Sequence, residues 1–465
     1  MAAEPSIPAD ASAAEADYVR ASRLAARGRV EEAKAAYLAA LAKDPTHFGA
    51  LNDFGSLLYA ADYRSAARLV YAEAVKHHPD NAMGRINLAN ALLADGQIAA
   101  ARGHYEAALQ LAPDHPDACQ GLANLLQDEG DAEAAEHYRR RSYRRRQIAA
   151  LPFRGAGAPC RVLLLASAAG GNVPTRFLLD ESLFATFVLA VEADAATGPL
   201  PEHDLVFNAV GDPDLAPGAV EAATAVAARS RAPLINPPAR VRETGRAAIA
   251  RRLAGIPGLR TPRVETAARE ALSREAERFG FPLLLRSPGY HTGRNFVRVE
   301  TAAELDAAAG ALPGRELLLI EPLDARDRQG RWRKYRVMMI GGALHPLHLA
   351  VSRDWKVHYF TADMADAPAH RAEDEAFLAD MAGTLGPRAM AALGAAAERL
   401  GLDYGGIDFG LGPEGEVLLF EANATMVVNP PDPDPRFVYR RAPTQRILAA
   451  AKAMLLERAG FTVER

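Results

Sequence analysis

The first third of the chain repeats one pattern of apolar and small residues every 34 positions. Proline recurs at Pro45, Pro79 and Pro113. An alanine column and a tyrosine column keep the same period, at Ala33, Ala67, Ala101 and Ala135 and at Tyr37, Tyr71 and Tyr105. Each unit carries two apolar stripes at helical spacing and closes with a proline that cannot continue the second helix. The pattern predicts stacked helical hairpins over residues 15 to 147, after a flexible tail of residues 1 to 14.

The last unit departs from this pattern, because Tyr138 is displaced by one position and no proline closes the unit. Such a departure is typical of a terminal unit that faces solvent. The run YRRRSYRRRQ within it could bind an acidic partner or nucleic acid. A solvated capping helix is the favoured interpretation, because no aromatic platform accompanies the arginines.

These repeats resemble the tetratricopeptide repeat. In that family the small alanines let paired helices approach closely, and the tyrosine fills the space beside them. The resemblance implies a solenoid whose groove binds a peptide or protein segment and that performs no chemistry of its own.

After a linker at residues 148 to 159, short apolar runs alternate with helical stretches. The runs RVLLLAS, DLVFNAVG and PLINPP predict a small parallel sheet within an α/β domain at residues 160 to 262. Further on, FPLLLRSPGYHTGRNFVRV predicts two strands joined by a loop that carries Gly289 and Gly293. Glycine lets a backbone close over phosphates, although such a loop is a plain surface hairpin as often.

The stretch GIDFGLGPEGEVLLFEANATM predicts a hairpin with oxygen donors on one face. Glu421 and Asn423 are two apart in the return strand, so both side chains leave the same face. Symmetric closure of the turn would place Asp408 opposite Leu419 and diagonal to Glu421. Two carboxylates and an amide oxygen, with no His or Cys nearby, suit a hard cation such as Mg²⁺.

From about residue 160 to the C-terminus, the order of these parts resembles ATP-grasp proteins of the carboxylate-amine ligase type. That group includes D-alanine ligases, glutathione synthetases and ribosomal-protein glutamate ligases. The resemblance implies an all-α repeat solenoid followed by an α/β domain and an α+β ATP-grasp domain at residues 263 to 465, with an ATP lid at about 263 to 325. It also implies ATP and Mg²⁺, with the metal held by Asp408, Glu421 and Asn423.

The resemblance further implies a set of nucleotide contacts in the lid, the flap and the hinge that meets adenine. These are Arg286, Gly289, Gly293, Glu321, Pro322, Leu323 and Asp324, with Asp327 as the alternative to Asp324 for the ribose.

Two positions depart from the family pattern. Arg286 stands where a phosphate-binding lysine is usual, and an earlier lysine position falls among Arg246, Arg251 and Arg252. Arginine keeps the charge but is bulkier and less easily placed between two phosphates. The arginine that usually precedes the magnesium aspartate is absent, since Gly405 and Gly406 stand there.

The family reaction transfers the γ-phosphoryl group of ATP to a carboxylate, and an amine then attacks the acyl phosphate to give an amide. Candidate catalytic residues are Arg336 in KYRVMMI and Arg353, Lys356 and His358 in SRDWKVHYF. The cations would meet negative charge, and His358 is the candidate base. The second segment alternates at period two, which fits a strand lining a cleft or an amphipathic surface strand equally.

The favoured hypothesis is an ATP-dependent ligase for carboxylate and amine substrates, small or peptidic, with the repeats holding a polypeptide. One alternative is a repeat scaffold whose nucleotide-binding domain has lost turnover, which Arg286 suggests. Another is phosphoryl transfer without ligation.

The composition limits the classes of partner and the cellular compartment that we expect. The 465 residues include 54 Lys and Arg against 58 Asp and Glu, so the net charge of −4 favours neither nucleic acid nor a membrane as partner. Two cysteines, Cys119 and Cys160, cannot form a disulfide framework and favour a reducing compartment. The N-terminus lacks a signal sequence pattern and there is no long apolar run, so we expect a cytoplasmic protein.

Overall fold

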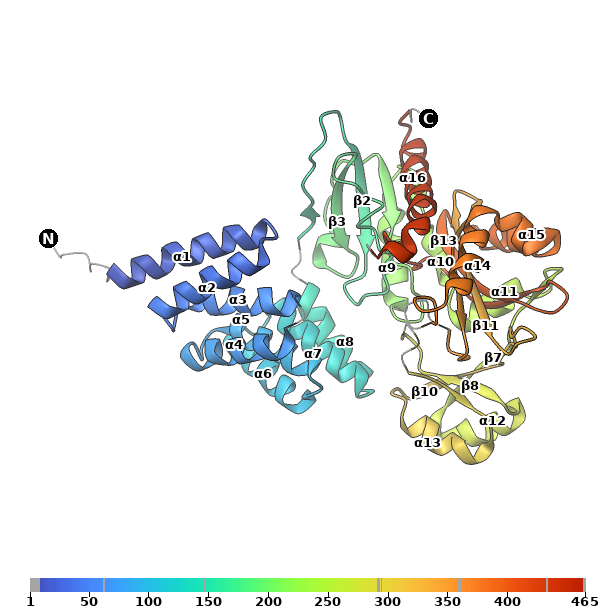
Figure 1. Cartoon of the computed structure of the whole chain (residues 1–465), viewed down its shortest axis with the longest axis horizontal. Helices are drawn as coiled ribbons and strands as arrows, with labels where there is room; N and C mark the ends of the chain where they lie inside the picture. The colour runs from blue at the N-terminus through green and yellow to red at the C-terminus, as the bar shows by residue number, and fades with distance from the viewer. Residues whose placement is uncertain are drawn as a thin grey trace. The chain divides into compact units, whose positions relative to one another are not determined.

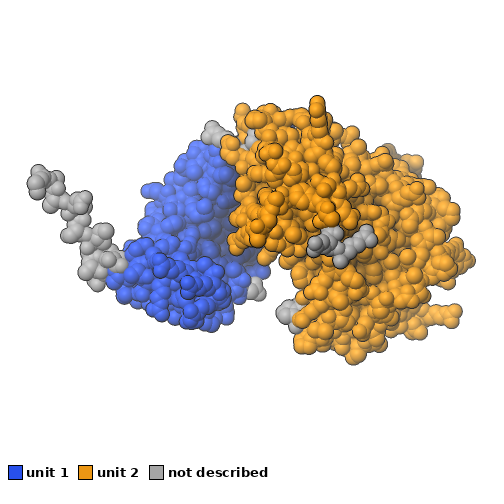
Figure 2. Space-filling view, turned by 90° about the horizontal axis from the view of Figure 1, so that it is seen from above, with its two compact units in different colours: residues 1–142 blue, residues 143–465 orange. Residues whose placement is uncertain are grey.

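The computed structural model describes residues 9–61, 63–144, 147–290, 293, 295–357, 362–431 and 434–462. The chain divides into two compact units, residues 1–142 and 143–465, which are coloured separately in Figure 2. The first unit is helical, and the second combines helices with sheets (Figure 1).

The described part of the first unit is a series of antiparallel helical hairpins, as the repeat pattern predicted. Its helices are α1 (Ala9–Ala26), α2 (Val30–Lys43), α3 (Phe48–Ala60), α4 (Arg64–His77), α5 (Ala82–Ala94), α6 (Ile98–Leu111), α7 (Pro116–Asp128) and α8 (Ala132–Tyr143). α1 begins at Ala9 rather than at residue 15, so this helix extends into the stretch predicted as a flexible tail. Alanine, the strongest helix former, dominates that stretch.

The alanine and tyrosine columns form the core of this unit, which confirms the packing predicted from the repeat. All four column alanines are fully buried, and Tyr37, Tyr71 and Tyr105 are at most 5% exposed. Each tyrosine hydroxyl meets a polar side chain 15 residues earlier, which is Ser22, Ser56 or Asn90. A buried ring with a bonded hydroxyl therefore links the two helices of each hairpin.

The second unit begins with a five-stranded sheet in the order β1-β3-β2-β4-β5. Its strands are β1 (Ala149–Ala150), β2 (Cys160–Ala166), β3 (Phe184–Ala190), β4 (Leu205–Asn208) and β5 (Leu234–Ile235). The predicted parallel pairing is confirmed for β2 to β5. β1 lies in the predicted linker and adds an antiparallel edge to β3. The helical elements here are η1 (Asp194–Thr197), α9 (Pro217–Ala227), α10 (Pro238–Arg242) and α11 (Arg246–Leu253).

A separate antiparallel sheet in the order β7-β10-β8-β9 forms the region predicted as a lid. Its elements are β7 (Val264–Ala268), η2 (Arg269–Ala271), α12 (Leu272–Phe279), β8 (Leu283–Arg286), β9 (Phe296–Val299), η3 (Ala302–Glu304), α13 (Leu305–Gly310) and β10 (Glu316–Ile320). The hairpin predicted around Gly289 and Gly293 is confirmed as β8 and β9. The sheet and its two helices share one small apolar core (Figure 1).

The central sheet has the order β12-β11-β13-β14-β6. Its elements are β6 (Leu259–Arg260), β11 (Trp332–Ile340), β12 (Ala343–Ser352), α14 (Pro368–Ala379), α15 (Met381–Leu400), β13 (Tyr404–Leu411), β14 (Val417–Asn423), η4 (Pro435–Arg440) and α16 (Arg441–Arg458). Tyr335 and Phe409 stack on the core face of this sheet, with ring centroids 5.3 Å apart. The opposite face is therefore free to carry polar groups. No described helix is long and apolar enough to span a bilayer.

The predicted register of β13 and β14 was wrong. Asp408 lies opposite Glu421, and Phe409 lies opposite Leu419, so Phe420 is an extra residue at a bulge. The turn is also one residue longer than symmetric closure assumed, because Gly415 adopts a left-handed conformation with φ of 76°. Phe420 packs against the small cluster of Leu323, Ala325 and Leu418.

Gly121→Ala should destabilise the repeat unit, because a Cβ at this buried position of α7 would overlap the Tyr105 ring. Overpacking of this kind costs about 1–3 kcal/mol. Gly103→Ala in α6 is the matched control, since nothing lies within 4 Å of its Cβ position. We expect the control to gain up to about 1 kcal/mol from helix propensity. Scanning calorimetry should therefore show the unfolding midpoints of the two variants shifted in opposite directions from the wild type. Equal shifts would contradict the packing described.

Candidate active site

Four polar residues form a row across four neighbouring strands of the central sheet. His348 on β12, Arg336 on β11, Asp408 on β13 and Glu421 on β14 are successive cross-strand partners. Directly opposed residues project from the same face of a sheet. The row therefore places two carboxylates, a guanidinium and an imidazole along one surface.

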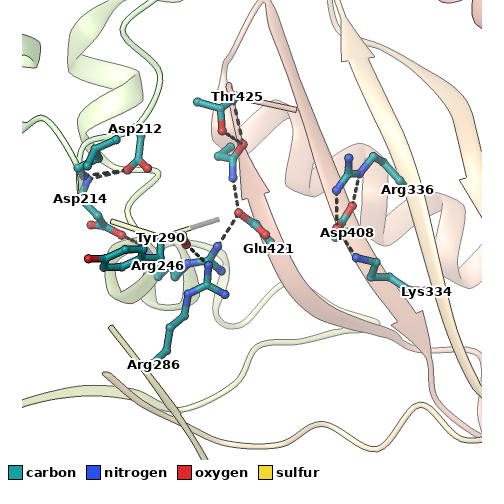
Figure 3. A network of polar contacts seen from close by, with 12 residues as sticks. Asp212, Asp214, Arg246, Arg286, Tyr290, Lys334, Arg336, Asp408, Glu421 and Thr425 are labelled. Atoms are coloured by element: carbon teal, nitrogen blue, oxygen red, sulfur yellow. Dashed lines mark hydrogen bonds and ion pairs between the residues drawn. The ribbon is translucent and has the colours of Figure 1, made fainter. Parts of the chain in front are cut away.

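Asp408 is held by two cations, as Figure 3 shows. It accepts hydrogen bonds from Arg336 Nε at 2.5 Å and Nη2 at 2.8 Å, and Lys334 Nζ lies 3.2 Å away. Burial alone would raise the pKa of Asp408, but the Arg336 and Lys334 charges outweigh it and hold that pKa well below its usual range. Asp408 therefore stays ionised although it is only 2% exposed.

Glu421 is oriented from two sides. Its Oε1 accepts from Arg246 Nη2 at 2.8 Å and from Asn423 Nδ2 at 2.7 Å. The Asn423 Oδ1 accepts from the Thr425 N–H at 2.9 Å and hydroxyl at 3.0 Å. In this arrangement Asn423 positions Glu421 and turns its own oxygen toward Thr425. Glu421 and Thr425 are labelled in Figure 3.

The donor set fits a hard cation. Asp408 and Glu421 face each other across one strand pair, and both are ionised oxygen donors with cationic neighbours. Rotation of the Asn423 side-chain amide by half a turn would exchange the positions of its oxygen and nitrogen. Its oxygen would then lie on the side of Glu421 and give a third oxygen donor. Among the described residues no three His, Cys, Asp or Glu side chains come together as a metal site.

Arg286 is the last residue of β8. It lies beneath the flap, which is the loop between β8 and β9, and points into the same cavity. It is 5% exposed, its guanidinium lies 5.0 Å from the centroid of the Phe296 ring, and it donates to the Tyr290 carbonyl. Burial, and then the charge of Arg246, lower the pKa of Arg286 to about 10. Within the described residues its Nε has no hydrogen-bond partner.

Lys356 lies at the rim of the cavity, facing the flap. Its Nζ donates to the Gly293 carbonyl at 3.2 Å, while burial and the Arg286 charge lower its pKa. Gly293 has φ of 72°, and a Cβ there would stand 3.2 Å from the Lys356 chain. The close approach therefore needs glycine. Gly289 has φ of 75° and lies against Leu215.

The predicted hinge lies at one end of the cavity. Glu321, Pro322 and Leu323 line it beside Trp332. The Glu321 carboxylate ties the hinge to the preceding segment, since it pairs with Arg260 at 2.6 Å and accepts from the Arg263 N–H at 3.0 Å.

The two candidates for the ribose are engaged elsewhere. Asp324 pairs with Arg326 at 2.6 Å, and neither it nor Asp327 is among the described residues that line the cavity. Asp327 pairs with Arg331 and Arg333.

The structure separates the catalytic candidates. Arg336 and Lys356 line the cavity, whereas Arg353 is exposed and is not among the described lining residues. His358 lies outside the described residues. A different histidine, His348, lines the cavity, and burial together with the Arg336 and Arg440 charges lowers its pKa well below the usual value. Sequence reasoning missed both His348 and Arg440.

Of the three arginines considered for the earlier lysine position, only Arg246 lines the cavity. Arg252 instead donates to the Arg399 carbonyl at the end of α15, at 2.7 Å from its Nη2, and Arg251 is exposed. At Gly406 a Cβ would stand 2.7 Å from Met426, so a side chain there is excluded. Arg336 reaches Asp408 from the neighbouring strand instead.

These groups share one cavity of about 870 Å³. Its lining includes the hinge, Gly293 of the flap, the oxygen donors and Arg440. Such a volume with a few convergent polar groups is typical of a ligand site.

A family model described as tetratricopeptide repeat matches residues 92–138. A MamA structure from Desulfovibrio magneticus is 23% identical, covers 27% of this chain and 71% of its own, and has a TM-score of 0.25. A RimK domain ATP-grasp protein from Sphaerobacter thermophilus is 19% identical, covers 64% of this chain and 99% of its own, and has a TM-score of 0.39. The first repeat domain of Spaghetti (RPAP3), bound to an HSP90 peptide, is 20% identical and has a TM-score of 0.25. The match covers 26% of this chain and 97% of that one. No curated protein matches the chain.

Arg336→Gln should destabilise the second unit, because it leaves the buried Asp408 carboxylate with Lys334 alone. Removing one partner of a buried pair costs about 3–5 kcal/mol. Asp408→Asn in the same chain should recover much of that loss. Arg326→Gln is the control, since its pair with Asp324 is more than half exposed and is worth at most about 1 kcal/mol. Denaturant unfolding compares the wild type, both single variants, the double variant and the control, and an additive double variant would contradict the coupling.

Proposed function

We propose that the protein is an ATP-dependent ligase that joins a carboxylate to an amine through an acyl phosphate. One observation carries the proposal: Asp408 and Glu421 oppose each other in a cavity that also holds Arg246, Arg286 and Lys356. Two hard oxygen ligands beside three cations fit a metal nucleotide better than either component alone.

The chain's own residues divide the work of binding the nucleotide. Arg286, Lys356 and the flap backbone would receive the phosphates, and Leu323, Trp332 and Phe420 would enclose the base. Asp408, Glu421 and Asn423 would hold magnesium, which when bound neutralises the phosphate oxygens. Arg246 would exchange its bond with Glu421 for a phosphate oxygen.

The reaction then proceeds in two balanced steps. A carboxylate oxygen attacks the γ-phosphorus, so that a new P–O bond forms while the bond to ADP breaks. The amine nitrogen next attacks the acyl carbon, a C–N bond forms, and phosphate leaves with the C–O bond electrons. Arg336 would neutralise charge that develops on the acyl group, and the proton that the amine loses would pass to the leaving phosphate.

The repeats would hold a peptide or protein segment. Three equivalent positions on successive hairpins, Ser56, Asn90 and Asn124, are exposed and polar, which suits contact with a peptide backbone. The two cysteines are free and buried, which agrees with a cytoplasmic setting.

A second candidate is a nucleotide-binding scaffold without turnover. The observation that favours it is that each carboxylate already has an arginine partner, Arg336 for Asp408 and Arg246 for Glu421. Such internal compensation would weaken a metal site.

Glu421→Gln should lower the affinity for ATP with magnesium by at least about tenfold, because it removes one of two anionic ligands. ATP without magnesium should bind both proteins alike. Glu414→Gln in the turn of the same hairpin is the control, since that side chain is 79% exposed. Calorimetric titration measures the binding, and ADP release with mixed acids and amines measures turnover. Metal-dependent binding without any turnover would favour the scaffold, and no binding would reject both candidates.

Arg286→Met should weaken nucleotide binding by about tenfold or more, because the phosphates lose a buried cation. Arg286→Lys should retain most of the affinity, since it keeps the charge. Arg274→Met on the exposed side of α12 is the control. If Arg286→Met binds the nucleotide as the wild type does, Arg286 serves only to support the flap.

A further inference from the structure

The cavity continues beyond the row of polar residues, past His348, into a region that the nucleotide does not explain. We call this region the acid lobe and define it by His348, Met364, Met426, Val427, Phe437 and Arg440, all of which line the cavity. His348 and Glu421 are three strands apart, which corresponds to ~14 Å. The acid lobe therefore lies at the opposite end from the hinge, and its interpretation rests on the proposed function.

The walls of the acid lobe are tied to the central sheet. The Val351 N–H donates to the Met364 sulfur at 3.4 Å, and the Tyr404 hydroxyl donates to the Met426 carbonyl at 3.0 Å. Arg440 Nη2 donates to the Leu347 carbonyl at 3.3 Å. Each of these segments is thus fixed to a strand of the central sheet, and the lobe is part of the folded framework.

Arg440 is held from behind by a buried acid. Its Nε lies 3.5 Å from an oxygen of Asp374, which is fully buried. Asp374 also accepts from the Leu349 N–H and from the Tyr439 hydroxyl, both at 2.7 Å. Burying a carboxylate is unfavourable unless its bonds are satisfied. Asp374 is therefore a positioning residue that fixes the Arg440 guanidinium at the cavity wall.

Arg336 presents a second guanidinium to the same place. Its Nε and Nη2 are bonded to Asp408, and no Nη1 bond is formed within the described residues. Arg336 is the cross-strand partner of His348, and Arg440 is bonded to the residue before His348. Both guanidiniums lie near enough to His348 for their charges to lower its pKa.

The remaining wall is apolar. Met364 and Met426 are almost fully buried, and methionine adapts readily to the shape of a ligand. Val427 is 38% exposed although it lines a cavity. Arg436, which lines the cavity and precedes Phe437 in the chain, is paired with Asp434 at 2.6 Å. An aliphatic group would find contacts here, whereas a second carboxylate would meet Asp434.

We propose that the acid lobe binds a carboxylic acid with an aliphatic side chain. Its carboxylate lies between Arg336 and Arg440 over the His348 ring, and its aliphatic group packs on Met364, Met426 and Val427. Arg440 determines binding of the acid, and Val427 determines the preference for an apolar side chain.

The test uses the full chain saturated with magnesium and a non-hydrolysable ATP analogue. Calorimetry compares N-acetyl-L-leucine with N-acetyl-L-glutamate and with N-acetyl-L-leucinamide, which lacks the carboxylate. We expect the leucine derivative to bind at least about tenfold more tightly than either of the others. Arg440→Gln and Val427→Asp should each reduce that binding about tenfold or more, while affinity for the ATP analogue stays unchanged. Arg446→Gln, exposed on α16, is the matched control.

Asp374→Asn tests positioning separately. It should weaken the leucine derivative less than Arg440→Gln does, and Arg440→Lys should restore part of the binding that Arg440→Gln loses. Retained affinity for the ATP analogue shows in each case that the variant is folded.

Three results would overturn the inference: equal binding of leucinamide, equal or tighter binding of the glutamate derivative, or unchanged binding by Arg440→Gln. Failure of the proposed function looks different, because the wild type would then either not bind the ATP analogue or release no ADP with any acid and amine. The leucine, glutamate and leucinamide series measured without nucleotide would still decide the acid lobe by the same ratios.

Discussion

The buried ion pair between Arg336 and Asp408 is the contact on which the arrangement of the second unit's site depends. Taking two charges out of water costs several kcal/mol for each ion, and only excellent geometry offsets that cost. The bidentate bond and the nearby Lys334 supply it. Because the two partners stand on adjacent strands, their bond also holds β11 and β13 in a register that lines up His348, Arg336, Asp408 and Glu421.

The bulge at Phe420 solves a conflict between two neighbouring regions. Without it, strict alternation would place Phe420 opposite Asp408 on the polar face. The extra residue instead brings Glu421 opposite Asp408 and lets the Phe420 ring join the small cluster with Leu323 beside the hinge. A single irregularity therefore serves both the oxygen donors and the wall at the other end of the cavity.

Local periodicity was enough to predict the repeats, the parallel sheet, the flap hairpin and the hairpin that carries Asp408, Glu421 and Asn423, because each rests on residues close together in the chain. The register was not predictable, since it depends on the φ of Gly415 and on a bulge. Arg440 and Asp374 carry no local signal, because they meet His348 only after segments some 25 to 90 residues apart fold together. Arg336 was identified from its strand, but its bond to Asp408 emerged only from the pairing of β11 with β13.

The two positively charged side chains under the flap, Arg286 and Lys356, bear on which ligand the site suits. Arg286 is almost fully buried, and its charge lowers the pKa of the nearby Lys356. Within the described residues neither side chain pairs with a carboxylate. Two like charges held together in a partly dry site disfavour folding unless an anion joins them. A domain that had lost its anionic ligand would gain stability from almost any neutral residue at position 286. Under the proposed function, Arg286 would be one part of a site that a polyphosphate completes.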